Sequence, residues 1–415
     1  MTMPPLQPPR LRRDRFTWTL TGWFIAWGWL LYSFNPAVPL LAEEFGVSRA
    51  AAGLHGTAMA AGAVLAAGLT PALVRRIGRR ATLVVAGVVL VAGVLLLIAG
   101  HGLPMTLSGM AVTATGGNLA ISAAQAGLVI HQGPAASAAM SLVNGVGAGI
   151  GLIGPLALGG SVALGWGWRP AVAVTAVFAA VTAVLTARLP RTEAFARPAA
   201  PGRGADARRA GTGATHDGDA PPPLRPELVR ASRWFLVVVL AALATENATT
   251  YWATDLVLQR TGAGAGIATA TTAGLLAGMT VIRFVVGPLS LRVPPTRLLM
   301  VSFGVSVLGW AVLWTATVPW VAVAGLVVTG LGYGALYPLG VALLLAAAQG
   351  RTDRAQAQST LAGGLAIGVA PFLLGFLADR VGPHQAFILV PILAVAGGIA
   401  AWRGGLAARA GSSTS

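Results

Sequence analysis

The sequence predicts an all-α membrane protein with twelve transmembrane helices. Hydrophobic residues make up 55% of its 415 residues and charged residues only 10%, whereas about a quarter of a typical soluble domain is charged. Apolar runs of about 20 residues follow one another along the chain, and each is long enough to cross a hydrocarbon core of about 30 Å. We therefore expect a lipid bilayer to surround most of the molecule.

The predicted helices are the apolar runs between short segments rich in Arg, Gly and Pro. In chain order they cover 17–41, 51–74, 81–100, 104–130, 137–163 and 170–188, then 234–258, 264–291, 297–316, 320–348, 356–378 and 386–403. In the first of them Asn35 is followed by Pro36, and Pro39 comes three residues later. Because proline removes a helical hydrogen bond, these residues predict a bent end of the first helix.

Residues 189–231 interrupt this pattern. They are rich in Pro, Gly, Ala and Arg, with Asp206, Asp217 and Asp219 interspersed. Such a composition buries too little apolar surface to fold. We expect a disordered cytoplasmic linker here, between an N-terminal six-helix bundle (1–188) and a C-terminal six-helix bundle with a short cytoplasmic tail (232–415).

The positive charge is distributed unevenly between the two sides of this topology. All 28 basic residues are Arg. With the N-terminus inside, 23 of them fall in inner segments, and only Arg49, Arg169, Arg260 and Arg380 fall in outer loops. This pattern predicts a multi-pass protein of the cytoplasmic (inner cell) membrane with both termini cytoplasmic. Because the charge lies between apolar runs, we expect no nucleic acid as a partner.

The two halves share features at a separation of 216 positions. The pairs at this offset are Pro155 and Pro371, Gly159 and Gly375, Arg76 and Arg292, and Gly116 and Gly332. A fixed offset across a six-plus-six layout is typical of an internal repeat. It predicts that the two bundles are related by pseudo-symmetry.

A short basic motif follows the second helix. The run 71–80 contains Arg75, Arg76, Gly78, Arg79 and Arg80 and is similar to the cytoplasmic loop motif G-x-L-A-D-R-x-G-R-R. On this motif and the layout, the chain resembles the major facilitator superfamily. The resemblance implies two pseudo-symmetric six-helix bundles around a central substrate cavity.

The copy of the motif departs from the family at two positions. Pro71 stands in place of the first Gly, and Arg75 stands in place of the Asp. A gating role centred on that Asp therefore cannot be carried over to this chain. The remaining arginines have two interpretations, a positive anchor at the inner surface or a part in gating.

Two further runs resemble different branches of the family. The Gly-rich run 145–160 is similar to the Gly-Pro signature of exporters, although its spacing is one residue longer, and it also suits a closely packed, bendable helix. The run 330–338 resembles the flexible cavity-lining helix of sugar-permease-like members. Many proton-coupled members have an arginine in the fourth helix, and 104–130 contains none. The subfamily is therefore left open.

Two ionisable residues lie deep inside predicted helices. Glu246 is 13 residues beyond Arg233, and Arg283 is nine residues before Arg292, so at 1.5 Å per residue they lie about 20 and about 14 Å from the inner boundary. A charge in hydrocarbon costs about 2.5–3.5 kcal/mol on insertion scales. We predict that the two pair beside a wet cavity and that Glu246 carries protons.

Each of these residues also has a structural interpretation. The polar face that includes Glu246 could form a hydrogen-bonded seam between helices, and Arg283 could extend to the nearer membrane surface. Asp255, nine residues beyond Glu246, is expected at a hydrated helix end near the outer boundary.

Other polar side chains inside predicted helices are candidates for substrate contact, with interhelical hydrogen bonding as the alternative. The candidates are Tyr32, Asn35, Asn118, Gln125, Asn144, Asn247, Thr250, Tyr251, Tyr333 and Tyr337. No cluster suggests a metal site, and we expect no cofactor.

The motifs of the competing functional classes do not occur. The chain has no Cys and no Lys, which excludes a thiolate site and the nucleotide-binding G-x-x-x-x-G-K-[ST] loop. It also lacks H-E-x-x-H, G-x-S-x-G and a T-V-G-Y-G filter, so an enzyme with catalytic residues and a channel are less favoured. We expect a secondary active transporter that works as a monomer by alternating access. It would carry out proton-coupled efflux of a small organic molecule or, alternatively, proton-coupled uptake of a sugar-like or other polar nutrient.

Overall fold

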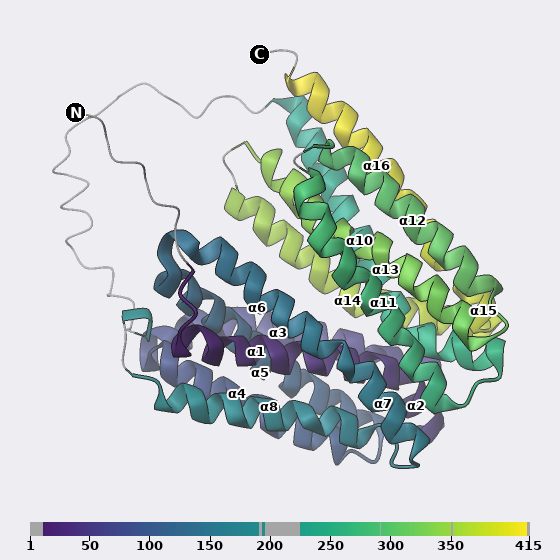
Figure 1. Cartoon of the computed structure of the whole chain (residues 1–415), viewed down its shortest axis with the longest axis horizontal. Helices are drawn as coiled ribbons and strands as arrows, with labels where there is room; N and C mark the ends of the chain where they lie inside the picture. The colour runs from purple at the N-terminus through teal and green to yellow at the C-terminus, as the bar shows by residue number, and fades with distance from the viewer. Residues whose placement is uncertain (1–10, 191–192, 196–224, 291, 350–351, 413–415) are drawn as a thin grey trace.

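The computed structural model describes residues 11–190, 193–195, 225–290, 292–349 and 352–412. All regular elements in these ranges are helices (Figure 1), which confirms the predicted all-α class. Eleven helical spans are long and apolar enough to cross a membrane. A further helix, α5, has 30 residues and is also long enough, but Gly, Thr and amide side chains make it more polar. Together they give the twelve predicted spans.

The first bundle is formed by the first six spans. Its elements are α1 (Arg15–Phe34), η1 (Asn35–Ala37), α2 (Val38–Phe45), α3 (Arg49–Ile77), α4 (Arg79–Ile98), α5 (Leu103–Gln132), η2 (Gly133–Ala135), α6 (Ala136–Gly151), α7 (Ile153–Ala163) and α8 (Arg169–Arg188), followed by η3 (Glu193–Phe195). The second bundle contains α10 (Pro226–Thr261), α11 (Ala265–Ser290), α12 (Pro295–Thr315), α13 (Pro319–Ala346), α14 (Thr352–Val381), α15 (Pro383–Ala386) and α16 (Leu389–Ser412).

Two spans are broken near their middle or end. The first changes from α-helix to a 3-10 turn at Asn35–Ala37 and continues as α2, with Pro36 in the turn. This is the bend that the prolines predict. The fifth span is divided into α6 and α7 at Leu152, within the glycine-rich run.

The seventh helix begins earlier than predicted, and this corrects one end of the predicted linker. It starts at Pro226 instead of near 234, so residues 226–231 of the predicted linker 189–231 are helical. Pro226 stands in the first turn and is followed by Glu227. Proline suits this position because the backbone N–H that it lacks would have no helical partner there. The Glu227 carboxylate is stabilised by the positive end of the helix dipole. Residues 193–195 form a 3-10 turn, and 196–224 lie outside the described residues.

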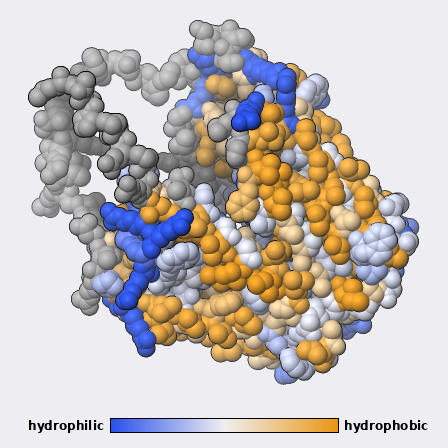
Figure 2. Space-filling model, in the orientation of Figure 1, coloured by the Kyte–Doolittle hydropathy of each residue, from blue (hydrophilic) through white to orange (hydrophobic). Residues whose placement is uncertain are grey.

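The ends of the spans define two faces of the molecule. We call the face where α1 begins and α16 ends the terminal face, and the opposite one the far face (Figure 1). Apolar side chains cover most of the visible sides of both bundles, whereas strongly hydrophilic ones gather toward the terminal face (Figure 2). Exposed side chains such as Val64, Val88 and Trp320 are what a bilayer-facing surface requires.

The internal repeat is visible in the packing. Gly93 of α4 lies against the backbone of Thr113 in α5, and Gly309 of α12 lies against Thr329 in α13 in the same way. In each pair the threonine hydroxyl donates to a glycine carbonyl four residues earlier, at 2.7 and 2.8 Å. The two pairs are 216 positions apart, so the same helix crossing occurs once in each bundle.

Such crossings depend on the absence of a side chain. A Cβ at Gly309 would lie under 3.0 Å from the backbone nitrogen of Thr329, and forcing extra atoms into a packed site costs about 1–3 kcal/mol. We expect Gly309→Ala to lower the thermal unfolding midpoint measured by fluorescence-detected size-exclusion chromatography. A Cβ at Gly304 of the same helix would meet no atom of a neighbouring described element within 4 Å, so Gly304→Ala is the matched control. Equal midpoints for the two variants would contradict the close crossing.

Candidate functional site

The two bundles are in contact along two seams that lie toward the far face. One seam joins α3 to α14, and the other joins α7 to α11. The terminal-side half of the fifth span, α6, has far fewer contacts with α11 than α7 has. The helices of the two bundles diverge toward the terminal face (Figure 1). The structure is therefore sealed at the far face and parted at the terminal face.

Glycines bring the backbones together at both seams. Gly159 of α7 and Gly266 of α11 face each other so closely that a Cβ on either would lie under 3.0 Å from the other's carbonyl oxygen. Gly53 of α3 meets the backbone of Phe372 in α14 in the same manner. The hydroxyl of Thr57 also donates to the carbonyl of Gly368 across this seam, at 2.6 Å.

A charged cluster reinforces the far seal. Arg49, at the start of α3, pairs with Asp255 of α10 in the opposite bundle, with 2.6 Å between Nε and Oδ2. The carboxylate of Asp379 in α14 accepts hydrogen bonds from the backbone N–H groups of Arg49 and Ala50, both at 2.8 Å. These bonds satisfy free donors at the positive end of α3.

The position of Asp255 corrects an expectation. Its helix end was expected to be hydrated, but the residue is only 7% exposed and paired across the bundles. Arg49 and Asp379 were not recognised as functional candidates at all. Charged residues are rare in the predicted outer loops, and this rarity is the signal that the sequence offers for them. The pairing itself joins segments far apart in the chain and has no local pattern.

Glu246 and Arg283 lie on contacting helices of the second bundle, α10 and α11, and no ion pair within 4.0 Å joins them among the described residues. Tyr32 of α1, in the first bundle, lies close enough to interact with both charges. Glu246 and Tyr32 are partly exposed, and Arg283 is exposed. Because one neighbour of the charged pair belongs to the opposite bundle, Glu246 faces the space between the bundles.

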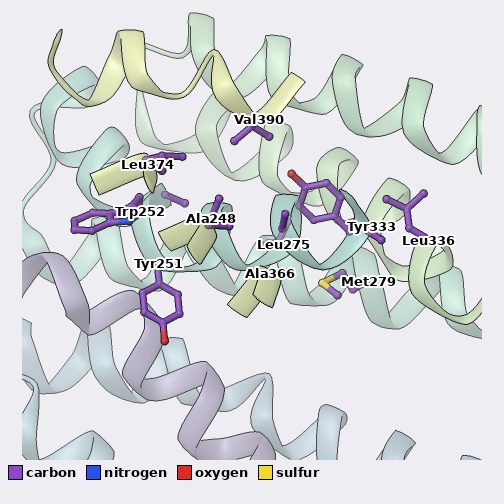
Figure 3. Close-up of a cluster of buried hydrophobic side chains, with 14 of the residues drawn as sticks. Ala248, Tyr251, Trp252, Leu275, Met279, Tyr333, Leu336, Ala366, Leu374 and Val390 are labelled. Carbon is purple, nitrogen blue, oxygen red and sulfur yellow. The ribbon is translucent and has the colours of Figure 1, made fainter. Parts of the chain in front are cut away.

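The neighbouring residues Asn35, Thr250 and Tyr251 extend this polar region toward the far face. Asn35 and Thr250 line a small pocket between η1, α10 and α11. The ring of Tyr251 points from α10 toward the N-terminal bundle, away from the cluster around Leu275 and Met279 (Figure 3). Its hydroxyl is buried and has no hydrogen-bond partner among the described residues.

Tyr333 of α13 lies elsewhere. It is 2% exposed and lies within the apolar cluster of the second bundle (Figure 3). Its hydroxyl shares a 2.9 Å hydrogen bond with that of Thr249 on α10. Both helices belong to the second bundle, so this tyrosine joins two of its helices from within. Tyr337, four residues on, is 38% exposed.

The other predicted amide residues do not converge on the charged pair by hydrogen bonds. The side chains of Asn118, Asn144 and Asn247 each donate to a carbonyl four residues earlier on their own helix, at 2.8 Å. Gln125 on α5 is half-buried. These bonds satisfy the amide donors locally and leave the side-chain carbonyls for other partners.

The glycine-rich run of the fifth span serves close packing. Gly147, Gly151 and Gly154 lie against the backbone or Tyr32 side chain of α1, and Gly159 lies against α11. A Cβ at Gly145 or Gly149 would meet no atom of a neighbouring element within 4 Å in the described part of the chain. The run therefore lets one broken helix contact both bundles.

The basic loop motif joins α3 to α4. Gly78 has a φ of 81°, a value that favours glycine, and Arg75, Arg76 and Arg80 surround this turn. Arg79 is buried and donates to the carbonyl of Ala194 in η3. The motif thus anchors the segment that follows α8.

A second contact at the terminal face was not predicted. Asp14 caps α1 by accepting from the backbone N–H of Thr17 at 2.9 Å, and its other oxygen lies 2.6 Å from His131 Nε2 on α5. Partial burial raises the pKa of Asp14, but its hydrogen bonds with Thr17 and His131 outweigh this effect and hold the pKa below its usual value. The contact ties the start of α1 to the end of α5.

The arrangement defines a class of protein. Two pseudo-symmetric bundles, sealed at one face and parted at the other, with charged side chains between them, are the architecture of a secondary transporter that works by alternating access. The chain belongs to the Major Facilitator Superfamily, whose family model matches residues 18–282 and 235–413. It is a multi-pass membrane transporter and not an enzyme.

Relatives of known sequence or structure agree with this class. An uncharacterized MFS-type transporter from Pseudomonas aeruginosa strain LESB58 is 36% identical over 106 residues, which cover 25% of this chain and 26% of the relative. A mutant of the nucleoside transporter NupG has a TM-score of 0.73 at 10% identity, covering 94% and 98% of the two chains. The xylose transporter XylE from E. coli, in a partially occluded inward-open conformation, has a TM-score of 0.70 at 13% identity, covering 94% and 96%. At these identities, the solved structures support the fold.

Removing one charge of the far seal should shift the conformational equilibrium. In Asp255→Asn the ion pair with Arg49 is lost, so we expect the far face to open more often. The sequence has no cysteine, and Ala270→Cys, at a partly buried position beside Gly159 in the α7–α11 seam, provides a single reporter. A water-soluble maleimide should label this cysteine several-fold faster in the Asp255→Asn background.

The control for this measurement is Glu43→Gln. Glu43 lines a pocket at the far face together with Arg49 and Asp255, but it forms no ion pair within the described part of the chain. An unchanged labelling rate in Asp255→Asn, or an equal increase in Glu43→Gln, would show that the Arg49–Asp255 pair does not hold the seal.

Proposed function

We propose that the protein exports a small organic molecule in exchange for protons, with Glu246 as the proton-carrying group and Arg283 as its partner. The observation that carries the proposal is the position of this pair between the bundles, next to Tyr32 of the opposite bundle. A carboxyl group that reaches the substrate space can exchange a proton with either side in turn.

The location of Tyr32 suggests how the two steps are linked. Glu246 and Arg283 belong to the second bundle and Tyr32 to the first, so a movement of one bundle against the other changes the surroundings of the pair. Charged and polar neighbours decide how firmly a carboxyl group holds its proton. Conformational exchange would therefore alternate between a state that takes up a proton and a state that releases it.

The arginine distribution supports an orientation for this cycle. The terminal face carries most of the arginines, so we assign it to the cytoplasm and the protein to the inner cell membrane. In this orientation the parted state opens to the cytoplasm, where a molecule for export is loaded. Both bundles come from one chain, which supports a monomer as the working unit.

Uptake of a polar nutrient is the second candidate. It is favoured by the residues with hydroxyl and amide groups that meet at the bundle interface, among them Asn35, Thr250 and Tyr32. A polar substrate is compatible with transport in either direction. Growth of a deletion strain on a panel of toxic compounds and nutrients distinguishes the two, since export predicts sensitivity and uptake predicts a growth defect.

The charge of Glu246 should be required for coupling. In proteoliposomes we expect Glu246→Gln to lower the rate of transport driven by a pH gradient by at least about tenfold, because the amide cannot take up a proton. Exchange of labelled for unlabelled substrate without a gradient needs no net proton movement and should persist. Full gradient-driven transport by Glu246→Gln would contradict the proposed role, and Glu227→Gln at the terminal end of α10 serves as the control.

A further inference from the structure

Two buried tyrosines of the second bundle differ in one respect. The hydroxyl of Tyr333 shares a hydrogen bond with that of Thr249, whereas the hydroxyl of Tyr251 has no hydrogen-bond partner among the described residues. Tyr251 is 0% exposed, and its hydroxyl oxygen is closed off from any water-sized space. A buried polar group without a partner raises the free energy because it has lost its bonds with water. The packing at Tyr251 therefore carries a cost that the packing at Tyr333 does not.

The unpaired hydroxyl lies at the contact between the two bundles. The ring of Tyr251 points from α10 toward the N-terminal bundle (Figure 3), and α10 packs against η1 and α2 of that bundle. Asp255 of the far seal follows Tyr251 by four residues on α10, which is a distance of about 6 Å along the helix at 1.5 Å per residue. Tyr251 therefore belongs to the sealed half of the interface.

Two further polar groups at this contact are unpaired in the same way. The hydroxyl of Thr254 is buried and has no partner within the described ranges. Thr254 follows Thr250 by four residues, so the two share one face of α10, and Thr250 lies at the interface with Asn35 of η1. The side-chain carbonyl oxygen of Asn35 is also buried without a donor in the part of the chain that the structure describes. The sealed contact thus isolates two donors and one acceptor.

Unpaired groups inside a single bundle have a different effect. Thr175 and Thr186 of α8 also have buried hydroxyls without a partner among the described residues, but α8 packs against α1, α4 and α7 of its own bundle. When the bundles move as units, such a group stays buried and its cost is the same in both states. A group at the contact between the bundles regains water when the far face opens. Its cost therefore applies to the sealed state alone.

We propose that the unpaired hydroxyl of Tyr251, together with Thr254 and Asn35, determines how readily the far seal opens. The Arg49–Asp255 ion pair and the glycine contacts stabilise the sealed state, and the unpaired groups oppose them. Tyr251 is thus a positioning residue of the transport cycle. The inference depends on alternating access and not on the substrate or on proton coupling, so it goes beyond the proposed export function.

This opposition gives the polar groups of the dry contact a role. A seal made only of favourable contacts would hold the protein in one state, whereas a transporter must populate both states in each cycle. A phenylalanine in place of Tyr251 would fill the same space without an unsatisfied hydroxyl. The tyrosine lowers the stability of the sealed state and makes its opening easier.

The variant Tyr251→Phe tests the inference in the purified full-length protein. It keeps the ring and removes only the unpaired hydroxyl, so the sealed state becomes more stable relative to the open one. The cysteine of Ala270→Cys in the α7–α11 seam reports opening of the far face through its reaction with a water-soluble maleimide. We expect labelling to be slower by about fivefold or more, as the loss of one unsatisfied buried hydroxyl predicts. The thermal unfolding midpoint should not fall.

Tyr333→Phe is the matched control. It removes the hydroxyl of another buried ring, which lies within the second bundle and is paired with Thr249. It should not slow labelling, and its unfolding midpoint should fall because the Thr249 hydroxyl loses its partner. Thr254→Val replaces a second unpaired hydroxyl with a methyl group and should slow labelling as Tyr251→Phe does, so the inference does not depend on one variant.

Three results would overturn the inference. They are unchanged labelling in both Tyr251→Phe and Thr254→Val, an equal slowing in Tyr333→Phe, and a lower unfolding midpoint for Tyr251→Phe, which would show that its hydroxyl is paired in the sealed state. The measurements need neither a substrate nor a pH gradient. They are therefore independent of the Glu246→Gln transport assay, and either proposal can fail while the other stands.

Discussion

Charged side chains inside a bilayer must find a partner or water, and this constraint organises the space between the two bundles. Arg49 and Asp255 satisfy it by pairing across the interface at the far end, and Glu246 and Arg283 lie on contacting helices of the second bundle, near Tyr32 of the first. Neither pair could be placed against lipid without a large penalty. The charges therefore mark the surfaces that the bundles turn toward each other.

The helical frame that holds these charges depends on small residues. Hydrophobic side chains gain little by leaving lipid for another apolar surface, so helices in a membrane associate through close backbone contact. Gly93 and Gly309 provide this contact within the bundles, and Gly159 and Gly266 provide it between them. The contacts within a bundle hold its helices together as one unit, and the contacts between the bundles allow the two units to approach and separate.

Much of this architecture can be predicted from the sequence. The spans, the bend at Asn35–Ala37 and the repeat at 216 positions follow from local composition and spacing, and the structure reproduces them. Helix boundaries were predicted less accurately, as the early start of α10 at Pro226 shows. An apolar run marks the membrane-spanning part of a helix, and the polar residues that extend the helix beyond it give no such pattern. Helix rise also places Glu246 and Arg283 deep inside their spans, and this depth stays a prediction.

Side-chain direction and partners could not be predicted in the same way. Tyr333 turns into its own bundle to meet Thr249, and Asp255 finds Arg49, a residue 206 positions away. Both outcomes depend on the rotation of a helix about its axis and on the neighbours that the fold supplies. A single sequence gives the polar residues of a helix, but the packed structure decides which of them meet.

The glycine crossing at Gly159 and Gly266 has a mechanical consequence. A seal made of interlocking side chains would have to disengage many rotamers each time it opened, whereas two bare backbones slide apart without rearranging anything. The strength of such a closure is set by the area of smooth contact and by the few charges at its rim. Glycine-to-alanine substitutions along this contact would then each change the lifetime of the closed state by a different amount.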